Sequence, residues 1–551
     1  MSTVRLNPLD TAWVLTETRA APNHIGGLLQ FRLPAGAPRD FLRRLMAEFR
    51  GYREFKPPWN RRLKYDIQFN PFPVWIEDED IDLEYHVRHA ALPWPGGERE
   101  LGELVGRLQS TPLDLSRPPW ECTIIEGLDE NRFAVFIKMH HSLIDGVSGM
   151  KLLQRSMSSD RRKSLGMPPF WASGAAPAHP AEAAAPAPTF ASAAAVAVEA
   201  LRCQVRTLPQ LVAAFAKLVT RTGDRGEGKV VPFESPLSVL NGRVREKRRF
   251  ATQQFAMERL RTLAKAADCT VNDVVVAICS GALRRFLLER DSLPATSLTA
   301  GIPVSVRPID DEGMGNAITW VVATLGTDIA DPAARLAAIK ASVHHAKDHV
   351  QGLPRAAMQQ YTMLLMAPTI LTMLTGIGGR VRPMFNVTVS NVHGPDEPLY
   401  FRGAELLAIY PASIVTHGQA LNITCQSYTG WMDFGFTGCH SSVPSLQRLA
   451  VYSADALREL EAAKLPRARA GRAQGHTAAR LPAPGSERAQ AATTKGSAAK
   501  APALRGRAAK AKAAKLPAAG SGRAAGAARR TAEPAHAGAP VVARPRARKA
   551  A

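Results

Sequence analysis

Closely spaced cysteines are missing from this chain of 551 residues. The six cysteines are scattered, at Cys122, Cys203, Cys269, Cys279, Cys425 and Cys439. Without a Cys-x-x-Cys pair, the sequence predicts neither a zinc ribbon nor a disulfide scaffold. The N-terminus, Met1 to Pro8, also lacks the apolar run of a secretory signal. We therefore expect a protein that is not secreted and that works in a reducing, cytoplasmic setting.

An apolar run long enough to span a membrane is also missing. The most apolar segment, Tyr361 to Gly378, has 18 residues but contains Pro368, four threonines and two glycines. A spanning helix usually needs about 20 mostly apolar residues. We interpret this segment as a pair of helices in the core or beside a substrate tunnel, with membrane contact as the alternative.

Acidic residues are nearly absent from the end of the chain. Residues 464–551 hold 20 lysines and arginines but only two acids, Glu487 and Glu533, so they carry +18 of the net +22. The first 463 residues keep only +4. The tail is rich in Ala, Pro and Gly and poor in large apolar residues, which predicts disorder. Its charge would attract anionic lipid or nucleic acid, and the alternative is a nonspecific solubilising tail.

Composition divides the chain into four parts. We expect an α/β lobe over 1–160, a Pro/Ala-rich linker and an amphipathic helix over 161–235, a second α/β lobe over 236–463 and the basic tail over 464–551. The amphipathic pattern over 193–221 would lie on an anionic membrane surface or, alternatively, pack on the protein.

The two lobes show alternating helix and strand patterns, which indicates a layered α/β fold. Helices are predicted over 41–49, 101–108 and 271–290, the last with Thr270 as its N-cap, and strands over 26–32, 122–126, 132–139, 297–306, 385–390 and 421–427.

The segment His140-His141-Ser142-Leu143-Ile144-Asp145-Gly146 follows one of these strands and precedes a helical pattern. It therefore lies on a strand-exit loop, where catalytic groups are often found. Imidazole suits a general base near pH 7. The alternative is a half-buried structural histidine pair, and a metal site would need further ligands that the spacing does not supply. The pair His344-His345 lacks the Asp-Gly and is predicted to lie on a solvated helix face.

This segment resembles the HHxxxDG motif of the CoA-dependent acyltransferase superfamily, which includes chloramphenicol acetyltransferase, condensation domains and bacterial wax ester synthase/diacylglycerol acyltransferases. Flanking segments favour the last of these. They are Leu6 to Asp10 (like LSPLD), Leu113 to Glu121 (like LDxSRPLWE), Asn272-Asp273 (like ND), Pro303 to Arg307 with Gly315-Asn316 (like PVSxR…GN) and Asn391 to Pro395 (like NVxGP).

The resemblance covers about residues 6 to 460 and implies both a fold and an activity. The fold would be two chloramphenicol-acetyltransferase-like lobes with a tunnel between them. The activity would be transfer of a fatty acyl group from acyl-CoA to diacylglycerol or a long-chain alcohol, giving triacylglycerol or wax ester. No cofactor is implied, since acyl-CoA is a substrate. Peripheral contact with a membrane or lipid inclusion is also expected, and nucleic acid would bind only through the basic tail.

The resemblance assigns catalytic roles within the motif. His141 would be the general base, which takes the proton of the acceptor hydroxyl as its oxygen attacks the thioester directly. His140 would position the loop. Asp145 would be structural, in an ion pair with Arg307.

It also assigns roles around the tunnel. Gly146 would leave the acyl channel open. Asn272 would donate to the oxyanion, although a residue at the start of a helix also forms local backbone bonds. Trp120, Asn391 and Gly394 would bind substrate.

Two departures from the family pattern concern the choice of substrate. Pro119 replaces the usual leucine, and Cys439 to Ser445 lacks the expected acids. One alternative is a related acyltransferase acting on another hydroxyl or an amine. A second is a non-catalytic lipid- or DNA-associated protein. The sequence leaves open the preferred acceptor, the acyl length and the oligomeric state.

Overall fold

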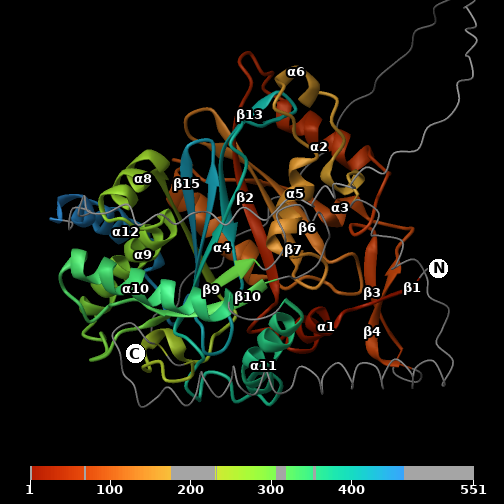
Figure 1. Cartoon of the computed structure of the whole chain (residues 1–551). Helices are drawn as coiled ribbons and strands as arrows, with labels where there is room; N and C mark the ends of the chain where they lie inside the picture. Colours follow the sequence, from red (N-terminus) through yellow and green to blue (C-terminus); the bar gives the residue numbers. More distant parts are fainter. Residues whose placement is uncertain are drawn as a thin grey trace, which may run out of the picture. The chain divides into compact units, whose positions relative to one another are not determined.

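Figure 1 shows the computed structural model, which describes residues 3–66, 70–174, 230, 232–305, 318–351 and 355–464. These residues form a mixed α/β structure, as predicted, with two six-stranded sheets and one of three strands. The small sheet has the order β1 (Thr3–Arg5), β4 (Asn70–Glu77), β3 (Arg61–Asp66). Arg307, the amphipathic pattern over 193–221 and the tail from residue 465 lie outside the described residues.

The first large sheet holds the strand that leads to the histidine motif. Its order is β12 (Tyr400–Phe401), β13 (Ala404–Ala412), β2 (His24–Arg32), β7 (Arg132–His140), β6 (Trp120–Leu128), β5 (Val87–Ala91). Strand β7 lies between β2 and β6 and is antiparallel to both. Because β12 and β13 come from the C-terminal half, the boundary expected at residue 236 does not separate the two large sheets.

The second large sheet is joined directly to the first. Its order is β10 (Ile318–Thr324), β9 (Thr299–Ser305), β11 (Val387–Val392), β14 (Leu421–Tyr428), β15 (Trp431–Cys439), β8 (Arg248–Ala256). A Cβ atom on Gly435 of β15 would lie 1.8 Å from the Pro411 carbonyl oxygen of β13, so glycine permits close backbone contact. The Asp433 carboxylate also accepts from Ile409 N at 2.7 Å.

Helices cover the second sheet with an apolar core. They are α8 (Met257–Ala266), α9 (Val271–Leu288), α10 (Pro332–Gln351) and α12 (Leu446–Ala462). Thr270 caps α9, as predicted, because its hydroxyl accepts from Asp273 N while the Asp273 carboxylate accepts from Thr270 N. The predicted exposure of His344 and His345 on α10 is confirmed.

The N-terminal half supplies six further helices among the described residues. They are α1 (Pro8–Leu15), α2 (Phe41–Gly51), α3 (Leu83–His86), α4 (Glu98–Ser110), α5 (Gly146–Gln154) and α6 (Arg161–Ser164). The helices predicted over 41–49 and 101–108 are thus confirmed within a few residues.

The linker predicted from residue 161 is wrong over residues 161–174. Helix α6 and a 3-10 turn at Phe170–Ala172 lie there instead. Phe170 and Trp171 are buried in the core of the first sheet. Two large aromatic side chains bury enough apolar surface to hold a proline-rich segment against the protein.

The apolar segment after residue 354 forms one helix rather than two, α11 (Arg355–Leu374), with Pro368 inside it. Tyr361 and Leu365 are buried, but Leu371 and Leu374 are exposed, so only one side of α11 belongs to the core. Among the described helices, none alone has the length and apolar character to cross a membrane. Helices α8 and α9 reach that threshold only as a pair, bent by 100° at the break between them.

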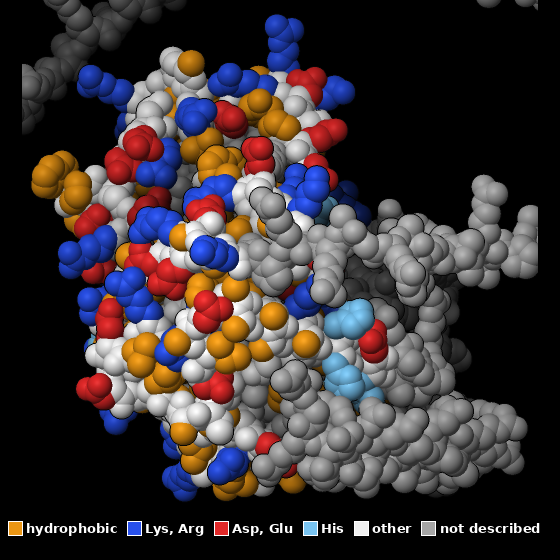
Figure 2. Space-filling model, turned by 60° about the vertical axis from the view of Figure 1, so that its left-hand side comes forward, with side chains coloured by type: hydrophobic (Ala, Val, Ile, Leu, Met, Phe, Trp, Pro, Cys, Tyr) orange, Lys and Arg blue, Asp and Glu red, His pale blue; other side chains and the backbone are white. Residues whose placement is uncertain are grey.

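Charge on the described surface is mixed in sign. Figure 2 shows one face on which lysine and arginine side chains lie among aspartate and glutamate side chains. This agrees with the small net charge of the first 463 residues.

Candidate functional site

The histidine motif joins strand β7 to helix α5, as the sequence predicts. His140 is the last residue of β7 and lies opposite His24 of β2. The next residues form a short turn, in which Leu143 N donates to His140 O at 3.0 Å. His141 N donates to Asn23 O at 2.9 Å. The end of β7 and the residue before β2 therefore fix the loop backbone.

His140 is fully buried, and both of its ring nitrogens are occupied. Its Nδ1 accepts from Ser142 N at 3.2 Å, with the Ser142 hydroxyl 2.6 Å away. An Nδ1 that accepts leaves the ring proton on Nε2, which donates to the Glu17 carboxylate at 2.5 Å. This ring therefore ties the loop to the segment after α1.

Sequence reasoning missed Glu17. It is the one acid between Asp10 and Asp40. That isolation was the available signal, and a carboxylate that the fold buries needs a partner.

His141 differs from His140 in that its ring has a nitrogen without a partner. Nδ1 is buried, and no described residue bonds to it. The ring lies against Trp13, with 4.7 Å between centroids. Burial lowers the pKa of His141 to about 4, although the Asp145 carboxylate raises it. The imidazole is therefore neutral at pH 7 and holds a lone pair that can accept a proton.

Asp145 caps helix α5. Its carboxylate accepts from Val147 N at 3.0 Å, from Ser148 N at 2.9 Å and from the Ser148 hydroxyl at 2.8 Å. These bonds satisfy the free N–H groups at the start of the helix. Its expected partner, Arg307, lies outside the described residues.

Gly146, the first residue of α5, has open space beside it. A Cβ atom there would meet only Ile25 Cδ1, at 3.8 Å. The described side chains therefore do not themselves require glycine at this position.

The Trp120 side chain is fully buried and lines no pocket described here. It is 0% exposed and stacks on His86 and Trp171. Its indole N–H donates to Trp59 O at 2.8 Å. The substrate-binding role predicted for Trp120 does not fit this position, since an aromatic cluster covers the whole side chain. The tryptophan in this family motif therefore serves to pack the core of the first sheet.

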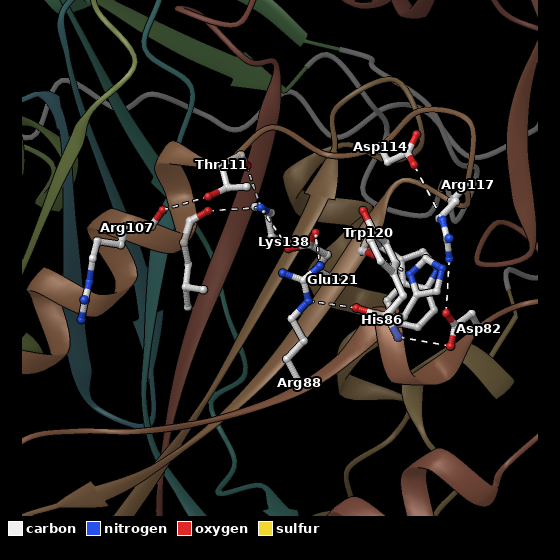
Figure 3. Close-up of polar contacts among 12 residues, drawn as sticks. Asp82, His86, Arg88, Arg107, Thr111, Asp114, Arg117, Trp120, Glu121 and Lys138 are labelled. Carbon is white, nitrogen blue, oxygen red and sulfur yellow. Dashed lines mark hydrogen bonds and ion pairs between the residues drawn. The ribbon is translucent and has the colours of Figure 1, made fainter. Parts of the chain in front are cut away.

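The rest of the segment before Trp120 forms polar contacts (Figure 3). Ser116 N donates to the Asp114 carboxylate at 2.9 Å, and Arg117 pairs with Asp82. Pro119, the departure from the family pattern, accepts from His140 N at 2.9 Å through its carbonyl. This backbone contact needs no particular side chain at 119.

A buried ion pair lies next to the motif, and sequence reasoning missed it. Lys138 of β7 is 3.1 Å from the Glu121 carboxylate and also donates to Leu108 O and Thr111 O at 3.1 and 2.8 Å. Arg88 pairs with the other Glu121 oxygen at 3.1 Å (Figure 3). Side chains alternate along a strand, so Lys138 and His140 share one face of β7. The ion pair therefore anchors the strand two residues before the motif.

Comparison with known proteins decides the family. Residues 6–275 match the model of the wax ester synthase/diacylglycerol acyltransferase catalytic domain, and residues 314–461 match that of the C-terminal domain of the same family. A putative diacylglycerol O-acyltransferase of Mycobacterium tuberculosis is 42% identical over 83% of this chain and 97% of that protein. The chain belongs to this family.

Further relatives agree. The O-acyltransferase WSD of Acinetobacter baylyi is 37% identical over 83% of this chain and 96% of that protein. The solved wax ester synthase/diacylglycerol acyltransferase of Marinobacter aquaeolei is 36% identical, with a TM-score of 0.66 over 83% of this chain and 98% of the other. A condensation domain of the calcium-dependent antibiotic synthetase, 18% identical with a TM-score of 0.52, shares the fold.

In this member of the wax ester synthase/diacylglycerol acyltransferase family, Asn391 borders an open pocket of about 290 Å³. The pocket is lined by Met257, Arg261, Val271, Asn391, His393, Asp396, Ser427, Tyr428, Thr429, Gly430 and Met432. Gly394 lies behind it, where a Cβ atom would approach Ser427 O to 2.1 Å. Glycine at 394 is thus required by packing against β14.

Asn272 is the second residue of α9 and follows the pocket residue Val271. Among the residues that the structure describes, none bonds to its side chain, whereas Thr270 and Asp273 bond to each other. The alternative reading, local backbone bonds by Asn272, is therefore not observed. The helix start places the side chain at the positive end of the α9 dipole.

Within the part of the chain that the structure describes, no group of three or more histidine, cysteine, aspartate or glutamate side chains could hold a metal ion.

Proposed function

We propose that this chain transfers a fatty acyl group from acyl-CoA to the hydroxyl of diacylglycerol or a long-chain alcohol, with His141 as the general base. The observation that carries the proposal is the neutral, half-buried His141 ring, whose buried Nδ1 has no partner among the described residues. Family membership supports the reaction class, and relatives named as diacylglycerol O-acyltransferases support the acceptor.

In the proposed reaction the acceptor oxygen attacks the thioester carbonyl while His141 takes the hydroxyl proton. The tetrahedral intermediate then collapses, the C–S bond breaks, and His141 returns the proton to the CoA thiolate. His140 and Glu17 hold the loop in place through their 2.5 Å hydrogen bond. A negative charge develops on the carbonyl oxygen, and preorganised donors stabilise such charge. We assign this role to the unpaired amide of Asn272.

The other roles follow from position. Asn391 would contact substrate at the pocket, and Gly394 and Trp120 would act through packing. The ion pair between Asp145 and Arg307 stays a prediction, as does binding of anionic lipid or nucleic acid by the tail.

The alternative function is acyl transfer to a different hydroxyl or an amine. A panel of diacylglycerol, hexadecanol and a long-chain amine, each with radiolabelled palmitoyl-CoA, distinguishes these acceptors. Transfer to the amine alone would contradict the proposal.

The pH dependence of kcat/KM should report the lowered pKa of His141. Only the neutral ring accepts a proton, and its pKa of about 4 lies below the ordinary value of 6.5. We expect kcat/KM to stay level from neutral pH down to about pH 5 and to fall below it. The measurement is a pH profile with diacylglycerol in mixed micelles.

Circular dichroism at each pH is the control for that profile. A buried neutral histidine costs stability in acid, because the unfolded chain binds the proton first as the pH falls from 6.5 toward 4. A loss of activity near pH 6.5 in a folded protein would assign the base to another group.

Gly146→Ala tests whether substrate passes beside the start of α5. The protein has room for the methyl group, and alanine in place of glycine usually adds about 0.4–1 kcal/mol of stability. We therefore expect unchanged or higher stability but a several-fold rise in KM for long-chain acyl-CoA, with a smaller effect for acetyl-CoA. Equal kinetics of variant and wild type for both donors would exclude an acyl channel at this position.

A further inference from the structure

Helix α11 carries apolar side chains on both of its sides. On the inner side, Tyr361 and Leu365 are each 3% exposed and pack in a core cluster with β10. On the outer side and just beyond the helix lie exposed leucine, isoleucine and valine side chains. This α11 apolar face consists of Leu364, Leu371, Leu374, Ile377 and Val381. Exposed large apolar side chains that gather in one region often mark a binding face.

The charged residues that are close to this face in the sequence have one sign. No acid occurs in the sequence between Asp348 and Asp396. Arg380 and Arg382 are exposed next to the apolar residues. Arg243 also lies here, since its guanidinium donates to Gly376 O at 2.6 Å. On the face drawn in Figure 2, by contrast, basic and acidic side chains are mixed.

We propose that the α11 apolar face docks on an anionic phospholipid layer. The leucines would enter the boundary of the acyl chains while Arg380 and Arg382 meet lipid phosphates. Interfacial helices combine an apolar face with basic flanks in this way, and anionic leaflets attract such cations. The inference rests on the proposed function, because diacylglycerol and long-chain alcohols reside in lipid layers rather than in water.

Contacts within the protein connect this face to the catalytic loop. A Cβ atom on Gly379 would lie 2.8 Å from Arg243 N, so the segment after α11 touches the segment before β8. The next residue, Val244, packs in a buried cluster with Ala21. Asn23 lies two residues after Ala21, and its carbonyl oxygen accepts from His141 N. A lipid layer against α11 would therefore lie close to the segment that holds the base.

The test uses the full chain with two charges added to the face, Leu371→Glu with Leu374→Glu. These side chains are 60% and 52% exposed, so the fold should tolerate the change. The matched control is Leu288→Glu with Val451→Glu, which lie on α9 and α12 and are 48% and 59% exposed. Partitioning is measured on phosphatidylcholine vesicles containing phosphatidylglycerol, at a salt concentration that suppresses binding by the basic tail. We expect about tenfold or greater weakening for the α11 variant and none for the control.

Activity on two acceptors separates docking from chemistry. The α11 variant should lose about tenfold in transfer to diacylglycerol within these vesicles but keep transfer to hexanol in water. Unchanged partitioning of the α11 variant, or an equal loss in the control, would overturn the proposal. So would a change from dimer to monomer with unaltered vesicle binding, because a second copy would then cover the face. Wild-type protein that binds vesicles but acylates neither acceptor would sink the proposed function and leave the docking supported.

Discussion

His141→Ala should lower kcat about 10²–10⁴-fold with little change in KM, the range typical for loss of a general base. The ring has a buried nitrogen without a partner and lies against Trp13, so its removal breaks no side-chain hydrogen bond among the described residues. We therefore expect the variant to fold. Acyl transfer from radiolabelled palmitoyl-CoA and thermal unfolding by circular dichroism measure the two effects on one preparation.

The neighbouring histidine supplies the contrast. His140→Ala removes the partner of a mostly buried carboxylate, Glu17, and should lower both stability and activity. His345→Ala, on the exposed face of α10, should change neither. If His141→Ala kept more than a tenth of the wild-type kcat, the assignment of the base would be wrong.

Lys138→Met should destabilise the protein by about 3–5 kcal/mol, the cost of breaking a buried ion pair from one side. The Lys138 side chain is 2% exposed, and Glu121 is 5% exposed. Without the ammonium group, Thr111 O and Leu108 O each lose one donor. Among the described side chains, Glu121 would then keep Arg88 alone as an ion-pair partner. Because the ion pair lies two residues before His140, activity should fall as well. Urea unfolding followed by tryptophan fluorescence gives the free energy.

Two further variants test the physical reason for that loss. Arg88→Met removes the outer partner of Glu121. Because the Arg88 side chain is 37% exposed, this change should cost about 1 kcal/mol or less. Adding Glu121→Leu to Lys138→Met removes the stranded carboxylate and should recover part of the stability. A Lys138→Met variant as stable as the wild type would show that water replaces the ammonium group at this site.

Local patterns in the sequence predicted the motif's surroundings well. The β-branched run before His140 and the apolar spacing after Gly146 are short-range signals, and they correspond to β7 and α5. The predicted N-cap Thr270 likewise bonds to Asp273, three residues away. Each of these features depends on residues close together in the chain, which periodicity and capping rules capture.

Features that depend on distant residues were missed. Glu17 and His140 are 123 positions apart, and nothing local marks them as partners. Trp120 was assigned to substrate because its motif resembles a family signature, but only the packing of Trp59, His86 and Trp171 shows that it is enclosed. Family signatures do not distinguish a residue that holds the site from one that touches substrate.

The pairing of β13 with β2 has a consequence for how the chain is made. The first sheet needs residues 404–412, so the edge of β2 has no partner until ~270 residues after His140 have been synthesised. At typical rates of about 5–20 residues per second, that delay is roughly 15–50 s on the ribosome. An open strand edge invites pairing with other chains. Newly made N-terminal halves are therefore the species in which chaperone binding and aggregation should be greatest, and expression of the first lobe alone should give insoluble protein.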